Sequence, residues 1–586
     1  MKTWGILIAF FIIAFVSPVD VLAAPIASGS FSTTWKTDNS GSSNSDQVSF
    51  HLGTGNDGES CLGTLYWEEL GNQSNNGSTT LDSPCNPETI TFPSAGMYRV
   101  DISGDFPTFN ISLAGDEQKI LTVEQWGDNE WATLEAAFYL ASNLTVPAVD
   151  APDLSQATDL RQMFYGATSF NQSIDHWDVS TITSINGMFY NAAIFNQPLN
   201  SWDVSNVTDM SGTFGNAQGF NQPLNSWDVS SVTVMSNGNK ARAIFGGATA
   251  FNQPLDNWDV SNVTDFSYLF QNATAFNQPL GTWNVSNATT MAFIFNAAEA
   301  FNQPLNTWSV SNVTTMESMF SGARVFNQSI GSWDVSNVTT MESMFAGAFD
   351  FNQSLDSWDV TNVENMDGMF SGTSLSTSNY SNMLTSWAAR PSLQSDVYLD
   401  ADIEYCTTAQ SARDVLTNNY SWLISDNGSA DCFNLVYTVG SNATLIGLAS
   451  QNVVDGEDGI SVEVIPNAGY RFVSWSDGRM DNPRSDTNIT ADFSVAALLE
   501  VGPIGGGNSG TRVGDRLQHK LAKSVTSSTE SIILGESIVT SLKKFITYLL
   551  INEEQLATLP PEESKKVILL MRDIIVYLLT LLPIYE

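Results

Sequence analysis

Carboxylates are the most numerous ionisable side chains in this sequence, and they could take part in a reaction or bind a ligand. Asp and Glu number 62 against 22 Lys and Arg, a formal net charge of −40, while histidine occurs only at His51, His176 and His519. The sequence has no His-Glu-x-x-His zinc motif, Gly-x-Ser-x-Gly nucleophile motif, Walker loop or complete EF-hand spacing. Two carboxylates can hydrolyse a glycosidic bond, but no spacing singles out such a pair. We therefore expect no catalytic residue and no enzyme activity.

Six aspartates occupy one position of a sequence repeat, directly after a tryptophan. These residues are Asp178, Asp203, Asp228, Asp259, Asp334 and Asp359. If the copies stack, the carboxylates form a solvent-facing row about 5 Å apart, which could bind a cation such as calcium or a basic ligand. The alternative is a solvated row that discourages aggregation, and Asn284 and Ser309 at the same position favour it. We expect no other metal and no organic cofactor.

The tryptophans before these positions also recur once per copy. They are Trp177, Trp202, Trp227, Trp258, Trp283, Trp308, Trp333 and Trp358. Each shares a face with a valine two residues later, which predicts packing in the core of the repeat; exposed platforms for stacking glycans are the alternative. The Asn and Gln of the Phe-Asn-Gln triplet are expected to form internal hydrogen-bond ladders.

The Phe-Asn-Gln triplet marks each copy of the repeat. It recurs at intervals of 25 residues, with one interval of 31. It begins at Phe170, Phe195, Phe220, Phe251, Phe276, Phe301, Phe326 and Phe351. Six extra residues at 237–242 explain the long interval and are expected to loop out. One copy cannot bury its apolar residues alone, so the regularity predicts a solenoid in which each coil packs on the next. Similar spacing at 134–144 and 154–164 predicts degenerate coils before the array.

Within one coil, the apolar spacing predicts a short strand followed by a tight helical turn. Trp202 and Val204 are two residues apart, as on one face of a strand. Met210 and Phe214 are four residues apart, as on one face of a helix. We therefore expect a ladder of short strands along one side of the solenoid.

Composition restricts the partners of the chain. Aromatic residues make up 11% and hydrophobic residues 42% of the sequence, which is too apolar for disorder over most of its length. The net charge of −40 would repel nucleic-acid phosphates and anionic membrane surfaces, so we expect neither as a partner. Residues 501–586 contain equal numbers of acidic and basic side chains, so the negative excess belongs to the residues before them.

The N-terminus predicts export. Lys2 precedes an apolar run over residues 6–16, and a small-residue cleavage site ends at Ala23. Residues 1–23 are therefore expected to be a cleaved signal peptide, with an uncleaved membrane anchor as the alternative. The expected location is secreted or at the cell surface.

Four cysteines fit the oxidising compartment that export would reach. Cys61 and Cys85 fall before the repeats, and Cys406 and Cys432 fall after them. The economical pairing is within each region. Each bridge would then close a loop of roughly 25 residues and contribute about 3 kcal/mol of stability.

The repeat resembles a known bacterial family. Its pattern Trp-Asp-Val-Ser-Asn-Val-Thr-x-Met, followed by Phe, Ala and Phe-Asn-Gln, is similar to the repeat of BspA-like leucine-rich-repeat surface proteins. The resemblance covers roughly residues 115–432. It implies a leucine-rich-repeat-type solenoid over 115–374 with a C-terminal cap over 375–432. It also implies a protein that is exposed on or released from a bacterial cell and acts in adhesion or recognition; the family supplies no catalytic residues.

Small β modules are expected on both sides of the array. The segment Ile90–Val100 resembles a strand of PKD-type β-sandwiches, so residues 24–114 are assigned a β-sandwich-like module. Residues 433–497 contain three segments of alternating polarity. Within them, Pro466–Gly478 resembles internalin B-type repeats, which are extracellular spacers of bacterial surface proteins.

The C-terminal region differs from the rest. Residues 498–511 are a glycine-rich linker, and apolar residues at helical spacing predict a helical tail over 512–586. Its last helix, Val567–Ile584, is short for a membrane span and contains Arg572 and Asp573. A packed or self-associating helical hairpin and an envelope anchor are two interpretations of this tail.

The expected fold class is mainly β with short helices. It comprises a leucine-rich-repeat-like solenoid of 25-residue coils flanked by small β domains and a C-terminal α-helical tail. The expected function is non-catalytic adhesion to, or recognition of, an extracellular protein or glycan by an exported bacterial surface protein. A structural envelope or matrix scaffold is the first alternative. A secreted glycan-active enzyme is a distant one.

Overall fold

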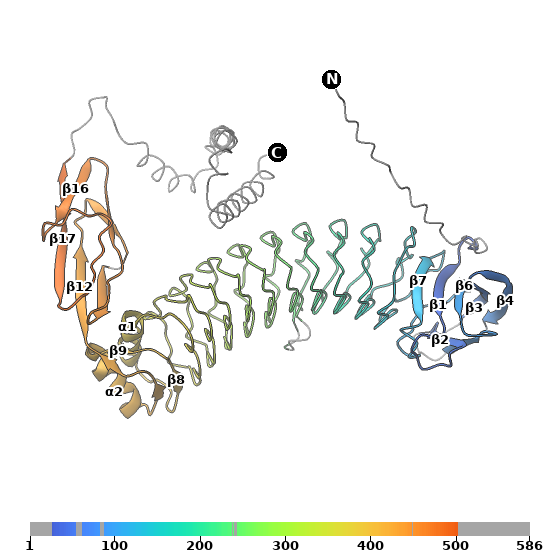
Figure 1. Cartoon of the computed structure of the whole chain (residues 1–586), viewed down its shortest axis with the longest axis horizontal. Coiled ribbons are helices and arrows are strands. Elements are labelled where there is room, and N and C mark those ends of the chain that lie inside the picture. Colours follow the sequence, from blue (N-terminus) through green and yellow to red (C-terminus); the bar gives the residue numbers. More distant parts are fainter. Residues whose placement is uncertain are drawn as a thin grey trace, which may run out of the picture. The chain divides into compact units, whose positions relative to one another are not determined.

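The computed structural model describes residues 26–53, 61–81, 87–236, 238, 243–447 and 449–501. Figure 1 shows an N-terminal β module, a row of coils and a C-terminal β module. All described residues except Val501 belong to one compact unit, Met1–Glu500. The predicted signal peptide and helical tail lie outside the described residues, as does most of the insertion at 237–242.

The N-terminal module has two β layers. Its strands are β1 (Phe31–Lys36), β2 (Gln47–His51), β3 (Leu62–Glu69), β4 (Asn72–Leu81), β5 (Pro87–Thr91), β6 (Met97–Asp105) and β7 (Ile120–Gln125). One sheet has the order β4-β3-β6-β1-β7 and the other pairs β2 with β5. Trp35 of the first sheet and Phe50 of the second are fully buried, with ring centroids 5.8 Å apart, so the core lies between the layers.

Strand β7 joins this module to the coils. It begins after residue 114, where we predicted the module to end, yet it pairs with β1 in the N-terminal sheet. On its other side, Thr122 forms a parallel bridge with Thr145 of the first coil. One apolar core runs without a break from Phe31 to Trp422. The N-terminal module therefore caps the array instead of being tethered to it.

Successive coils are bridged at one residue per coil. The bridges run from Asp159 through Ser184 and Asp209 to Val234, and after the insertion from Asp265 through Thr290, Thr315 and Thr340 to Asn365. This residue, here called the bridging residue, stands just before the methionine of the repeat. The coils therefore make a ladder of single bridges, not of extended strands.

The strand predicted at the Trp-x-Val step is wrong. The backbone folds into turns there, because the N–H of Trp202 donates to the carbonyl of Leu199 at 3.2 Å and that of Val207 to Val204 at 2.9 Å. The inward period-two spacing of Trp202 and Val204 is nevertheless kept, and both side chains are buried.

The predicted helical turn is also wrong, since consecutive turns replace it. The N–H groups of Met188 and Tyr190 donate to the carbonyl three residues earlier, whereas those of Gly187, Phe189 and Asn191 donate to the next coil. Gly187 and Asn191 have φ values of 61° and 59°. Because of this left-handed backbone, every second N–H group points along the stack toward the next coil. Steps of three and four residues are common to a helix and to such turns, so spacing alone does not separate them.

The core of the array is a continuous stack of phenylalanines. Phe195 stacks on Phe220 of the next coil, with centroids 6.0 Å apart and planes 1° apart. The ring of Phe189 also stacks on the ring of Phe195, six residues later in the chain, with centroids 4.3 Å apart. The degenerate coils predicted before the array are confirmed, since Phe138 stacks on Phe164 at 5.7 Å and both are fully buried. Each coil thus completes the core of its neighbours.

A compact cap follows the last coil. Its elements are α1 (Thr377–Ala388), β8 (Tyr398–Asp400), β9 (Tyr405–Cys406), the 3₁₀ turn η1 (Thr407–Ala409), α2 (Gln410–Asn419), β10 (Leu423–Ser425) and β11 (Ser429–Ala430). Met366 of the last coil bridges Leu399 of β8. Trp387 of α1 donates its indole N–H to the carbonyl of Leu355 at 3.2 Å, and so continues the tryptophan row. Within the described residues, no helix has the length and apolarity that crossing a membrane requires.

The C-terminal β module begins at the Cys406–Cys432 disulfide, which joins β9 to the first strand of the module. Its strands are β12 (Cys432–Thr438), β13 (Ala443–Ile446), β14 (Ser450–Val454), β15 (Glu463–Pro466), β16 (Tyr470–Trp475) and β17 (Phe493–Val501). They form the sheets β14-β12-β17-β16 and β13-β15. Arg484 is 3% exposed, lies over the rings of Trp475 and Phe493, and pairs with Asp486 at 2.7 Å. Among the described residues, regular structure is mainly β with two short α-helices.

Candidate functional site

The aspartate row caps turns of the backbone. The Oδ1 atom of Asp203 accepts the N–H of Ser205 at 3.1 Å and its hydroxyl at 2.6 Å. The corresponding backbone bond recurs at Asp178, Asp228, Asp259, Asp334 and Asp359, at 3.0–3.2 Å. Asn284 accepts the N–H of Ser286 in the same way. A turn-capping oxygen therefore accounts for the recurrence of Asp and Asn at this position.

These hydrogen bonds also stabilise the charged form of the row. The side chain and backbone of Ser205 hold the pKa of Asp203 below its usual value, and Asp178, Asp259 and Asp334 are shifted in the same direction by their own serines. Across the part of the chain that the structure describes, no three His, Cys, Asp or Glu side chains gather in a group that could hold a metal ion. Calcium binding by the row remains a prediction.

The tryptophan row faces the core. All eight repeat tryptophans are at most 4% exposed. From Trp202 onward, each indole N–H donates to a carbonyl of the preceding coil, for example Trp202 to Ile174 at 3.0 Å and Trp227 to Leu199 at 2.8 Å. Since the ring faces are buried in the array, they are not available for stacking on a sugar.

The Phe-Asn-Gln triplet forms the predicted ladder, which is confirmed. Oδ1 of Asn171 accepts the N–H of Asn196 at 2.9 Å and the side-chain amide of Gln197 at 3.1 Å. The Asn of the Asn-Val-Thr sequences is also engaged, since Nδ2 of Asn206 donates to the carbonyl of Ser180 at 2.8 Å. These amides link coils and are not free surface groups.

The described histidines and cysteines do not form a catalytic group. His176 is exposed and its Nε2 lies 3.3 Å from the carbonyl of Asp150, while burial lowers the pKa of His51 in β2. Cys406 is bonded to Cys432, and Cys61 is disulfide-bonded as well. Cys85 and His519 lie outside the described residues.

The coils differ from one another in the turn segment that follows the bridging residue, and also two residues before the triplet, as Glu299, Arg324 and Phe349 show. Two residues after it, in what we call the first variable row, successive coils carry Arg161, Asn186, Ser211, Ser236, Ser267, Ala292, Glu317, Glu342 and Asp367. The next position, the second variable row, carries Gln162, Gly187, Gly212, Ala243, Tyr268, Phe293, Ser318, Ser343 and Gly368. The small residues of these rows are mostly buried, whereas the large ones reach solvent. Stacking here uses the backbone, so the side chain is free to differ.

Our reasoning from the sequence missed these rows because it searched for what the copies share. The signal that finds them is the opposite one, namely positions that differ from copy to copy between two apolar positions that are buried in every copy. The second row separates a bridging residue from the buried phenylalanine, as Tyr268 does between Asp265 and Phe270.

Four residues of the variable rows form what we call the acidic aromatic patch: Tyr268, Phe293, Glu317 and Glu342. The rings of Tyr268 and Phe293 stack with centroids 4.7 Å apart and planes 7° apart. Partial burial and the nearby carboxylate of Glu342 raise the pKa of Glu317. Burial, then Glu317 and Asp265, raise the pKa of Tyr268, so Glu317 acts on the ring pair as well.

Among the residues that the structure describes, no Arg, Lys or His forms an ion pair with Glu317 or Glu342. Arg161 pairs with Glu135 and Asp159, Arg324 with Glu299, and Arg413 with Asp426. Glu342 accepts a hydrogen bond from the side-chain amide of Asn365 at 2.8 Å, which is a neutral partner. The patch therefore offers a ring pair and negative charge that no ion pair within the described part of the chain offsets.

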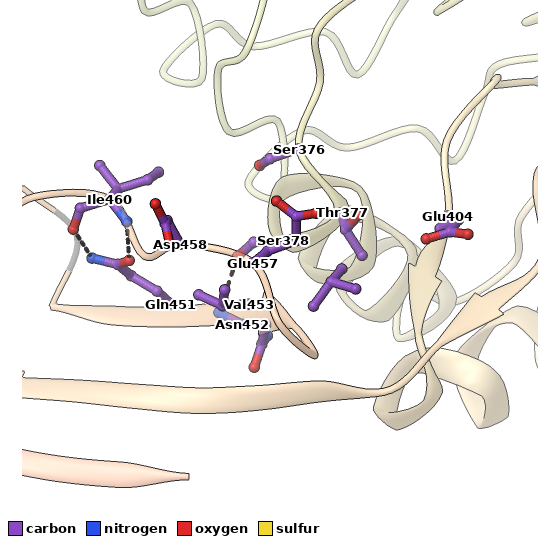
Figure 2. Close-up of a pocket in the computed structure, with 11 residues that line it drawn as sticks. Ser376, Thr377, Ser378, Glu404, Gln451, Asn452, Val453, Glu457, Asp458 and Ile460 are labelled. Atoms are coloured by element: carbon purple, nitrogen blue, oxygen red, sulfur yellow. Dashed lines mark hydrogen bonds between the residues drawn. The ribbon is translucent and has the colours of Figure 1, made fainter. Parts of the chain in front are cut away.

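A separate cavity of about 330 Å³ lies beside the N-terminus of α1 (Figure 2). Its lining includes Ser378 of α1, Glu404, and the segment from Gln451 of β14 to Ile460. The N–H of Asn452 donates to Oγ of Ser378 at 3.3 Å, and the side chain of Gln451 bonds both backbone groups of Ile460 at 2.7 Å. The lining has carboxylates and the hydroxyls of Ser376, Thr377 and Ser378, but no His, Cys or Lys.

Comparison with known families gives two matches. Residues 132–243, 236–324 and 303–395 match the family described as "Mycoplasma protein of unknown function, DUF285". Residues 433–498 match the family described as "Divergent InlB B-repeat domain", which confirms the resemblance predicted for 433–497. No curated protein and no solved structure matches the chain. The two matches support a bacterial surface repeat protein, and neither family is described as catalytic.

Proposed function

We propose that this chain is an exported bacterial surface protein of the BspA-like leucine-rich-repeat type, whose solenoid recognises an extracellular macromolecule without catalysis. The observation that carries the proposal is the variable rows. The residues that recur from coil to coil are used for core packing and ladders, while the large side chains of the variable rows differ from coil to coil and reach solvent. A constant scaffold with a varied exposed row is the arrangement that repeat proteins use for binding.

Several features make catalysis a poor explanation of the same rows. The recurring aspartates cap turns, the tryptophans are buried, and the triplet amides link coils. The charges that remain exposed vary in sign from Arg161 to Glu317. Such variation suits recognition of an irregular surface and would not preserve a reaction centre.

The class of partner that this surface suits is an extracellular protein ahead of a glycan. Sugars are bound by exposed aromatic faces, and the tryptophan row has none available. The negative excess of the chain favours a partner with basic patches. The tail at 512–586 would supply self-association or attachment to the envelope, and the C-terminal β module would act as a spacer.

The test uses the full mature chain. Labelled protein is applied to arrays of extracellular matrix proteins and glycans, beside a variant in which Arg161, Tyr268, Phe293, Glu317 and Glu342 are all replaced by Ser, a residue that other coils carry in both rows. The matched control is Asp203→Asn, which other coils also tolerate, as Asn284 shows. Binding that the row variant loses and the control keeps supports recognition by the rows. Binding that both variants keep would overturn it.

Two further observations separate the alternatives. Absence of any bound partner, together with ordered self-assembly of the full chain, would favour a matrix scaffold. Cell fractionation must place the protein outside the cytosol, at the surface or in the medium. Protein found wholly in the cytosol would contradict every version of the proposal.

A further inference from the structure

The stacked ring pair of the acidic aromatic patch stops after two coils. Tyr268 and Phe293 occupy the second variable row of neighbouring coils, and the next two coils carry Ser318 and Ser343 there. Within the described part of the chain, Phe293 stacks on no ring other than that of Tyr268. The stack thus has an end at which another flat group fits without displacing an aromatic side chain.

The fold does not require an aromatic side chain in this row, since other coils carry Gly, Ala, Ser or Gln there. Tyr268 and Phe293 have φ values of 64° and 60°, a left-handed backbone that is unfavourable for any residue with a Cβ atom, Ser318 and Ser343 of the same row included. The same row holds Gly187, Gly212 and Gly368, which adopt this backbone without that cost. Both rings are only half-buried, so burial offsets less of the cost than it would in the core.

The carboxylates beside the ring pair determine what would bind there. Glu317 and Glu342 occupy neighbouring coils and repel each other, and the N–H of Phe293 donates to the carbonyl of Glu317 at 2.8 Å. A bound group must therefore be cationic, and it must present a flat face to the ring. A bare metal ion is cationic but has no flat face, and among the described residues these two carboxylates do not belong to a group that could hold one.

The array already contains this combination once, with its cation in place. Arg324 lies over the ring of Phe349 with its guanidinium carbon 5.5 Å from the centroid, and pairs with Glu299 at 3.4 Å. These residues occupy one position of three successive coils. Carboxylate, guanidinium and ring are thus spaced by the coil repeat itself. The acidic aromatic patch has the carboxylate and the ring but lacks the guanidinium.

We propose that the acidic aromatic patch binds an arginine side chain of a protein partner, whose guanidinium stacks on Phe293 and pairs with Glu317 and Glu342. Arginine is favoured over lysine because its planar group can stack on a ring and pair with carboxylates at the same time. The inference rests on the proposed recognition by the variable rows and names the partner chemistry for one part of them.

The test measures binding of three labelled peptides to the full mature chain at 0.15 M salt. Each peptide has twelve residues, alternating glycine with arginine, with lysine, or with the neutral arginine analogue citrulline. The variants are Phe293→Ser and Glu317→Ala, which copy Ser318 and Ala292 of neighbouring coils. Asp203→Asn is the control, because it removes one carboxylate away from the patch.

The arginine peptide is expected to bind tightest, and either patch variant to weaken it about fivefold, the factor that corresponds to ~1 kcal/mol for one stacked cation. The control should leave its affinity unchanged, and melting temperatures show that the variants fold. Equal weakening by all three variants, or equal affinity for the arginine and lysine peptides, would overturn the inference. If the partner array still responds to the variable rows in that case, the proposed function stands without this partner chemistry.

Discussion

The ring of Tyr190 lies directly against the backbone of Gly215 in the next coil. A Cβ atom at Gly215 would lie 2.5 Å from Cδ2 of Tyr190, which is closer than atoms can approach. Tyr190 is itself held in place, because its hydroxyl accepts a hydrogen bond from the side-chain amide of Asn216 at 2.9 Å and its ring stacks on Tyr165 at 4.7 Å. The contact joins two coils through a position that must lack a side chain.

Gly215→Ala should therefore destabilise the array. The methyl group would force the ring of Tyr190 off Tyr165, at a cost of about 1–3 kcal/mol, which is typical of overpacking. The control is Gly281→Ala, where the added Cβ would meet Oγ1 of Thr307 at 3.4 Å and the carbonyl oxygen of Pro304 at 3.7 Å, both ordinary contact distances. Thermal unfolding followed by circular dichroism compares the two. Equal melting temperatures for both variants would contradict the packing described here.

The link between coils through the tryptophan row leads to a second prediction. Trp202→Phe keeps a buried aromatic ring but removes the N–H that donates to the carbonyl of Ile174 at 3.0 Å. The carbonyl is then left buried without this donor, and a cavity opens beside it. The expected loss of unfolding free energy is about 2–4 kcal/mol. Chemical denaturation measures it, and a loss below about 0.5 kcal/mol would argue that solvent reaches the carbonyl.

The sequence allowed the stacking of coils to be predicted, but not their backbone. Phe195 and Phe220 recur at a fixed interval, and this interval alone requires that one coil pack on the next. The left-handed backbone of Asn191 left no trace in the apolar spacing, because successive turns and a helical turn bury the same residues. Its role becomes visible only when its N–H is seen to donate to the next coil.

Pairings between distant segments could not be predicted from the sequence either. Thr122 of β7 meets Thr145, and nothing in either residue specifies that contact. It follows from the need to cover the first coil, which is a property of the whole array. The acidic aromatic patch was missed for another reason: Phe293 and Glu317 occupy positions that differ from copy to copy, whereas the repeat was recognised from what its copies share.

The aspartate row should stabilise the array through hydrogen bonds without calcium. Asp203→Ala removes the acceptor for Ser205 and should cost about 0.5 kcal/mol, a small value because the carboxylate is exposed. Asp203→Asn, which retains an acceptor oxygen, should cost less. Melting temperature measured with and without millimolar calcium gives the second readout. A rise with calcium that disappears in Asp203→Ala would instead assign a cation to the row.

The pH dependence of stability should have opposite signs at Glu317 and Asp203. The pKa of Glu317 is raised by burial and by Glu342, so its ionisation costs stability as the pH rises through its folded-state pKa. The pKa of Asp203 is lowered by Ser205, so its ionised form contributes stability that is lost as the pH falls through its folded-state pKa.

Neutral variants should reveal both effects. Relative to the unaltered chain, Glu317→Gln should melt higher at pH 7 and Asp203→Asn lower, and both differences should shrink toward acidic pH, where all the carboxyls are protonated. An arginine peptide should remove the advantage of Glu317→Gln, because a bound guanidinium offsets the repulsion between Glu317 and Glu342. If Glu317→Gln melts lower than the unaltered chain at every pH, the Glu317 carboxylate has a stabilising partner. The patch then needs no external cation.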